Sequence, residues 1–147
     1  MTEAYYKLLY DVLRSYNRST PSKVIRLRHG QVFVFGTDAK GSQRHGAAGL
    51  AAKNFGAQAG VKNGRTGDSY ALPTMGCTLD ELGAAIIQFE NYARDNKGTT
   101  FLVTPIGCGH AGFKVEDIAP YFRGCVALGN VMLPEQFLSF FRKECIE

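Results

Sequence analysis

The sequence predicts a three-layer α/β fold in which helices cover both faces of a mixed central sheet. Stretches rich in β-branched and aromatic residues alternate along the chain with stretches whose apolar residues recur at helical spacing. Such alternation is typical of a sheet packed between layers of helices. The length, 147 residues, suits one domain with a core of its own.

The first half of the chain carries signals for helices, strands and glycine turns. Apolar residues recur at helical spacing near the N-terminus, a Gln-Val-Phe-Val-Phe run is rich in strand formers, and a run of small residues suits a helix close to a sheet. In chain order, we expect a helix at 3–16, an exposed strand at 24–28, a turn at 29–30, a buried strand at 31–35 ending at Gly36, a helix at 46–55 stopped by Gly56, a polar glycine loop at 60–68 and a strand at 69–72 ended by Pro73.

The second half of the chain continues the alternation. Thr78 followed by Glu81 is a capping box, which places a helix start there. The elements expected are that helix, running to about residue 95, a strand at 100–106, a helix at 115–122, a strand at 130–133 and a closing helix at 135–143.

Composition limits the functions that the chain can have. With 17 basic and 13 acidic residues the net charge is +4, which suits an anionic ligand, but the basic residues are too scattered for a nucleic-acid surface. No run approaches the ~18 apolar residues of a membrane span. The N-terminus lacks the basic-then-apolar order of a signal peptide. We therefore expect a cytoplasmic protein that does not bind a membrane.

The cysteines are expected to be free thiols. Cys77, Cys108, Cys125 and Cys145 are widely spaced, with no Cys-x-x-Cys pair, and the cytoplasm is reducing. A zinc site from Cys108, His110 and a distant cysteine is an alternative, but no metal-ligand spacing repeats. We expect no metal and no cofactor.

Two glycine-rich loops follow predicted strands, and glycine lets backbone N–H groups approach a phosphate closely. The loop at 36–41 has P-loop spacing, but Ser-Gln replaces the Lys-Ser/Thr pair, which excludes an ATPase of that class. The loop at 107–112 has G-x-G-x-x-G spacing, but too few residues follow it for a dinucleotide fold. Open α/β sheets bind ligands at the carboxyl ends of their strands. A phosphorylated small molecule, most simply a nucleotide, is predicted to bind between the loops.

Asp38 and His45 flank this predicted site. His45 precedes a helix start, where free N–H groups and the helix dipole favour an anion. A carboxylate is repelled by phosphate, so Asp38 would serve a ribose hydroxyl or a water. Together the two side chains could position a water for attack on a glycosidic or ester carbon. Alternatively, His45 only caps or solvates its loop.

At these residues the chain resembles a macro domain, in a divergent bacterial and phage branch. The resemblance runs from about residue 32 to residue 134, roughly two-thirds of the chain. Its marks are Val-Phe-Val-Phe-Gly-Thr-Asp at 32–38, His-Gly-Ala-Ala-Gly-Leu-Ala-Ala at 45–52, Ser-Tyr-Ala-Leu-Pro-Thr at 69–74, Ile-Gly-Cys-Gly-His-Ala-Gly-Phe at 106–113 and Asp-Ile-Ala-Pro at 117–120. The Asn-Ala-Ala-Asn segment and the adenine-reading aspartate of many macro domains have no match.

The resemblance implies one macro-like domain over 1–147, with a helical extension at 1–22 and a core at 23–147. It also implies binding of ADP-ribose or a related NAD-derived nucleotide, free or on an ADP-ribosylated macromolecule. Asp38 stands near the place of the asparagine that contacts the distal ribose. The ligand-binding residues that it implies are Gly36, Thr37, Gly46, Ala47, Gly49, Gly107, Cys108, Gly109, His110, Ala111, Gly112 and Phe113.

Three functions remain open. The pair Asp38 and His45 would extend binding to hydrolysis of an ADP-ribosyl bond. Without turnover the protein would be a reader or a sequestering protein for the nucleotide. A structural protein that has lost the ligand is the third.

Several site residues also have plain structural interpretations. Cys108 is a nucleophile only if its pKa is lowered, and otherwise a small buried thiol. His110 is either a ligand contact or an exposed loop residue, and Phe113 is either a ribose wall or core. Thr104 is expected to pack within a strand, and Asp117 to cap a helix.

Overall fold

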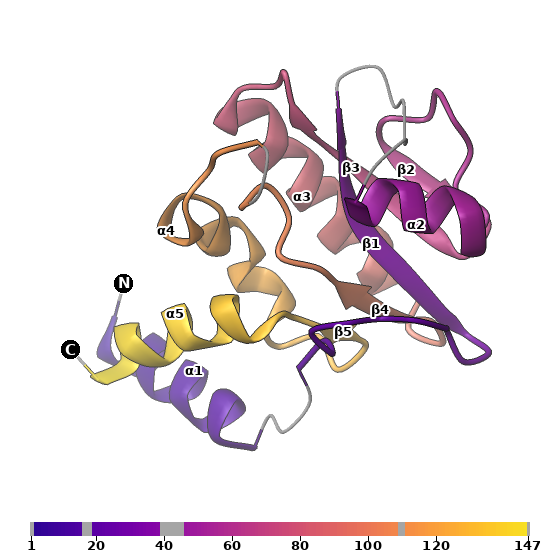
Figure 1. Cartoon of the computed structure of the whole chain (residues 1–147). Helices are drawn as coiled ribbons and strands as arrows, with labels where there is room; N and C mark the ends of the chain where they lie inside the picture. Colours follow the sequence, from indigo (N-terminus) through magenta and orange to yellow (C-terminus); the bar gives the residue numbers. More distant parts are fainter. Residues whose placement is uncertain (1, 16–18, 39–45, 109–110, 147) are drawn as a thin grey trace.

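The computed structural model describes residues 2–15, 19–38, 46–108 and 111–146 (Figure 1). Helices and strands alternate as the sequence predicts. In chain order the elements are α1 (Glu3–Ser15), β1 (Gln31–Asp38), α2 (Gly46–Asn54), β2 (Gly64–Thr66), β3 (Ser69–Met75), α3 (Leu79–Asp95), β4 (Thr100–Val103), α4 (Val115–Ile118), the 3₁₀ helix η1 (Ala119–Cys125), β5 (Val131–Met132) and α5 (Glu135–Ile146).

The strands form one mixed sheet in the order β2-β3-β1-β4-β5. β1 lies in the middle and pairs in parallel with β3 on one side and with β4 on the other. β4 and β5 are also parallel, whereas β2 is antiparallel to β3. The carboxyl ends of β1, β3 and β4 therefore meet at one edge of the sheet, which we call the carboxyl edge.

Helices cover both faces of the sheet, so the predicted α/β class is confirmed (Figure 1). Successive side chains of β1 alternate between two cores. Val32 and Val34 join the larger core, with buried residues of α1, α3, α4, η1 and α5. Phe33 and Phe35 join the smaller core, with Ala48, Ala51 and Phe55 on the α2 side. We call the faces the α3 face and the α2 face.

The N-terminal helix packs mainly against α5 rather than on the sheet (Figure 1). Its buried residues, Leu9 and Leu13, extend the larger core beyond the strands. The expected helix at 3–16 is confirmed, and its Tyr5 is partly buried against the larger core. None of the helices in the described ranges is both long enough and apolar enough to cross a bilayer.

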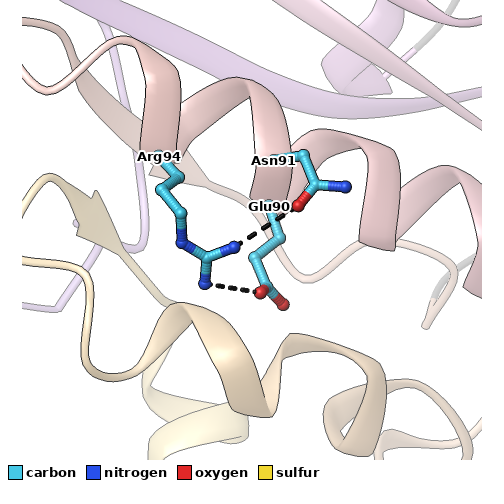
Figure 2. A network of polar contacts seen from close by, with 3 residues as sticks. All are labelled: Glu90, Asn91 and Arg94. Atoms are coloured by element: carbon cyan, nitrogen blue, oxygen red, sulfur yellow. Dashed lines mark hydrogen bonds and ion pairs between the residues drawn. The ribbon is translucent and has the colours of Figure 1, made fainter.

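Helix α3 runs from the carboxyl edge back across the α3 face. Its start is the predicted capping box: the Thr78 hydroxyl accepts from the Glu81 N–H, and the Glu81 carboxylate accepts from the Thr78 N–H. Near its other end Arg94 donates to Glu90 (2.9 Å) and to Asn91 (3.3 Å), as Figure 2 shows. Exposed pairs of this kind add only about 0.3–0.5 kcal/mol to a helix.

Two predictions in the first half of the chain are wrong, one of a strand and one of a loop. Residues 24–28 form no strand; Val24 turns inward to the smaller core while Ile25 stays 68% exposed. The polar glycine loop at 60–68 contains β2, a strand at the sheet border that has few apolar residues to reveal it.

Three predicted strand ends also differ. β1 continues past Gly36 to Asp38, and β3 continues through Pro73 to Met75. The partner β2 reaches only Ala71, so Pro73 leaves no β2 ladder bond unmade. By contrast β4 stops at Val103, three residues before the expected end.

The remaining elements agree with prediction within a few residues. The helix expected at 115–122 is α4 followed by η1, the strand at 130–133 is β5, and the last helix runs on to Ile146.

Candidate functional site

The carboxyl edge is the place where the two glycine loops begin. One loop follows β1 and the other follows β4, the adjacent parallel strand, so both leave the sheet at the same edge (Figure 1). After β1 the chain turns to the α2 face, whereas after β3 and β4 it turns to the α3 face. Open α/β sheets generally hold ligands at such a point, outside the carboxyl ends of strands whose connections go to opposite faces.

Loop 104–113 is fixed to β1 at its start. Thr104 donates both its backbone N–H (3.1 Å) and its hydroxyl (2.9 Å) to the carbonyl of Val34. Thr104 lies one residue past the end of β4, so its expected place within a strand is corrected: its hydroxyl bonds the same Val34 carbonyl as its backbone N–H. Sequence reasoning missed this role because a threonine in a strand is ordinarily a packing residue.

The same loop closes on itself. Phe113 donates its N–H to the carbonyl of Gly107 (2.9 Å). Gly107 and Gly112 both have left-handed backbone conformations, with φ of 76° and 78°, which favour glycine. A methyl group built on Gly112 would meet no atom of the described residues within 4 Å, so these residues leave the backbone open there. Such backbone is suited to close approach by a ligand.

Only part of the predicted catalytic pair can be placed. The backbone of Asp38 ends β1 and pairs with Met75 of β3, but its side chain lies outside what the structure describes. His45, Gly109 and His110 lie outside the described residues. The roles expected for these four residues remain predictions.

The other residues of the first loop lie at the carboxyl edge or just beyond it. Near the end of β1 lie Gly36 and Thr37. The start of α2 contains Gly46, Ala47 and Gly49. Helix α2 packs against β1. The predicted residues of the first loop thus lie on β1 and on the helix that packs against it.

The start of α3 at this edge is capped by the protein's own side chains. Its first turn is capped by the Thr78 hydroxyl and by the Glu81 carboxylate. Hydrogen bonds from Thr78 lower the pKa of Glu81, so the carboxylate stays charged and repels an anion. Of the long helices that begin at this edge, α2 has no acidic residue in its first turn and is the better partner for an anion.

Cys108 lies in the second loop as a half-buried thiol. Its thiol contacts the carbonyl of Ile106 at 3.6 Å. Burial raises the pKa of this thiol, and the nearby Asp117 carboxylate raises it further. A nucleophilic cysteine needs the opposite shift. The nucleophile interpretation is therefore not supported, and Cys108 is a free thiol like the other three cysteines.

Phe113 and Asp117 have structural contacts of their own. Phe113 is half-buried against the larger core, and its Cδ2 would lie 3.2 Å from a methyl group on Gly107. Asp117 accepts a hydrogen bond from the Lys114 N–H (3.1 Å), which confirms its expected role at the start of α4. A ligand contact by Phe113 stays a prediction, since its ring supports the loop from the core side.

Thr74 is a buried polar residue at this edge that sequence reasoning missed. Its hydroxyl donates to the carbonyl of Thr37 (3.0 Å), joining β3 to the end of β1. A methyl group on Gly36 would lie only 3.0 Å from Cγ2 of Thr74, so glycine allows this close packing. Sequence reasoning missed Thr74 because it ended the strand at Pro73, one residue earlier.

Two further observations limit the site. The side chain of Arg65 is used within the protein: it donates to the carbonyl of Gly67 (3.1 Å) and to the Tyr92 hydroxyl (3.3 Å). Within the described ranges no three His, Cys, Asp or Glu side chains gather into a group that could hold a metal ion.

Comparison of the chain with models of protein families, with curated proteins and with solved structures gives no match.

Proposed function

We propose that the protein binds ADP-ribose or a related NAD-derived nucleotide at the carboxyl edge, between the loop after β1 and the loop after β4. The observation that carries the proposal is the placement of these loops on adjacent parallel strands, with connections that diverge to opposite faces. Open α/β sheets generally bind their ligands at the point where connections diverge in this way.

The chemistry of the edge favours a phosphorylated ligand. The open backbone at Gly112 lets a phosphate approach closely. The start of α2 offers N–H groups that have no partner within the helix. The net charge of +4 also favours an anion. The macro-domain resemblance of the sequence narrows the anion to an ADP-ribosyl group, with or without an attached macromolecule.

The alternatives differ in what happens after binding. A hydrolase would use Asp38 and His45 to direct a water at the anomeric carbon, whereas a reader or sequestering protein would only hold the nucleotide. We place binding first, because both alternatives require it.

The test is calorimetric titration of the full chain with ADP-ribose, NAD and AMP, using two matched glycine variants. Gly112→Ala adds a methyl group to the open backbone of the second loop. Gly30→Ala adds one at the opposite edge of the sheet, where φ is 82° and the nearest atom would be 3.9 Å away. Both variants strain a left-handed residue by about 1–2 kcal/mol, so their stabilities should fall alike.

We expect wild type and Gly30→Ala to bind ADP-ribose one to one, and Gly112→Ala to bind at least tenfold more weakly. Absence of binding by the wild type to every nucleotide would reject the proposal. Equal affinity of the two variants for ADP-ribose would show that the ligand does not contact the second loop at Gly112.

A further inference from the structure

Residues 23–28, which we call the basic segment, have the sequence of a strand but belong to none. Their sequence is Lys-Val-Ile-Arg-Leu-Arg, and its β-branched residues favour a strand. The structure leaves the segment outside the sheet, and the backbone of residues 21–27 forms no hydrogen bond with a described residue. A stretch that favours a strand and has unpaired backbone groups is suited to pairing with another chain.

The basic segment is fixed to the protein by two apolar side chains and by its last residue. Val24 is buried in the smaller core, and Leu27 is partly buried against that core. The Arg28 N–H donates to the side-chain oxygen of Gln31 (2.8 Å), and the Arg28 carbonyl accepts from the Gln31 N–H (3.1 Å). In Figure 1 the segment leads to the turn that precedes β1. These contacts hold its other side chains in place on the surface.

The remaining side chains of the basic segment are exposed. Lys23, Arg26 and Arg28 form no ion pair with a described residue. Between them Ile25 is 68% exposed. Residues 12–37 contain no Asp or Glu, so no acidic residue nearby in the chain offsets these charges. Positive charges around an exposed apolar side chain suit an acidic partner that also carries an apolar group.

We propose that the basic segment binds an extended acidic segment of a partner protein. The carboxylates of the partner pair with the exposed cations, its backbone bonds with the free backbone of the segment, and an apolar side chain covers Ile25. The inference does not rest on the proposed function. The basic segment leads into the start of β1, whereas the nucleotide site is at the far end of that strand, roughly 20 Å away.

Charge and chemistry favour an acidic peptide over other partners. A second copy of the chain would place one basic segment against another, and like charges on paired strands are destabilising. Nucleic acid would pair with the cations, but it has no amide backbone to pair with the backbone of the segment. Anionic membranes are generally recognised by clusters of about 4–8 basic residues, more than the three of this segment.

Fluorescence anisotropy of the full chain with a short labelled peptide, in which glutamate and valine alternate, tests the inference. Two variants change the basic segment, and each has a matched control on a helix of the α3 face. Arg26→Glu is compared with Lys143→Glu, which changes the net charge equally at an exposed residue of α5. Ile25→Ser is compared with Ile87→Ser, because Ile87 of α3 is 50% exposed. The other probes are the same peptide with glutamine for glutamate, a single-stranded oligonucleotide and phosphatidylserine vesicles.

We expect the wild type to bind the glutamate peptide more tightly than any other probe, with an affinity that falls as salt is added. Arg26→Glu should bind this peptide at least about fivefold more weakly, the loss of one exposed ion pair. Ile25→Ser should bind at least about threefold more weakly, because an apolar contact is lost. Both controls should bind like the wild type. All four variants should keep the wild-type melting temperature, since every changed side chain is exposed.

Several results would overturn the inference. Equal affinity for the glutamate and glutamine peptides, or no binding of either, would show that the segment does not select an acidic peptide. Equal losses in Arg26→Glu and Lys143→Glu would show that only the net charge of the protein matters. Tighter binding of the oligonucleotide or the vesicles would assign the surface to another class of partner. The affinity for ADP-ribose, measured in the same variants, should not change, so the proposed function stands or falls separately.

Discussion

Gly107 lies directly against Ile118, so that a methyl group on the glycine would come within 2.5 Å of Cδ1 of Ile118. The second loop is therefore packed against α4 at Gly107. The loop is held by the larger core, to which Ile118 belongs, and not only by its own hydrogen bonds.

Gly107→Ala should therefore destabilise the protein by about 2–4 kcal/mol. The substitution combines strain at a φ of 76° with overpacking against Ile118. Chemical denaturation measures the effect. Gly112→Ala, which has the same strain but no neighbour within 4 Å among the described residues, should lose at most about 2 kcal/mol. Equal losses in the two variants would show that Ile118 does not support the loop.

Thr74→Val should lower the free energy of unfolding by about 1–2 kcal/mol. The substitution keeps the shape of the side chain but removes the hydrogen bond to the buried carbonyl of Thr37. Thr74→Ser, which keeps the hydroxyl, should restore most of the hydrogen-bond contribution. If Thr74→Val and the wild type unfold at the same denaturant concentration, the bond between β3 and the end of β1 contributes nothing.

Stability should fall at alkaline pH because of Cys125. Burial raises the pKa of this thiol, and the nearby Glu90 carboxylate raises it further. Above the ordinary thiol pKa of about 8.5 the unfolded chain loses the proton while the folded chain keeps it, so unfolding is favoured by up to about 1.4 kcal/mol per pH unit. Below that pKa both states hold the proton and the contribution is constant.

The variant Cys125→Ala should show a shallower fall in unfolding free energy between pH 8.5 and 10 than the wild type. Cys77→Ala, which keeps Cys125, should retain the wild-type slope. Identical slopes in wild type and Cys125→Ala would mean that the buried thiol does not couple to folding.

The enzyme alternative makes a prediction at Asp38. If the protein hydrolyses an ADP-ribosyl bond, Asp38→Ala should abolish the release of ADP-ribose from an ADP-ribosylated protein while affinity for free ADP-ribose stays within about fivefold. His45→Ala should behave alike. Loss of affinity together with turnover would make Asp38 a binding residue, and absence of turnover in a wild type that binds tightly would select the reader.

Local signals in the sequence predicted the fold where they agree with the packing. The Thr78 and Glu81 capping box and the apolar run of β1 are signals of this kind, and both elements form where expected. Strand ends were harder to predict, because they depend on neighbours. Pro73 is tolerated within β3 because β2 stops pairing at Ala71, and β4 ends at Val103 although the Thr104 N–H still donates to the carbonyl of Val34.

The candidate site was predictable only as far as glycine spacing reveals it. Gly107 and Gly112 were recognisable as positions of unusual backbone. The hydrogen bond from the Thr74 hydroxyl to the Thr37 carbonyl joins residues 37 positions apart in the chain, and no local pattern encodes it.

The most direct measurement is an amide NMR titration of the full chain with ADP-ribose. Binding at the carboxyl edge predicts that the amide signals of residues 36–37, 47–49, 107–108 and 111–113 shift. Signals at the opposite edge, residues 29–30 and 96–99, should stay in place. Shifts confined to the opposite edge, or none at saturating ligand, would contradict a nucleotide site between the two glycine loops.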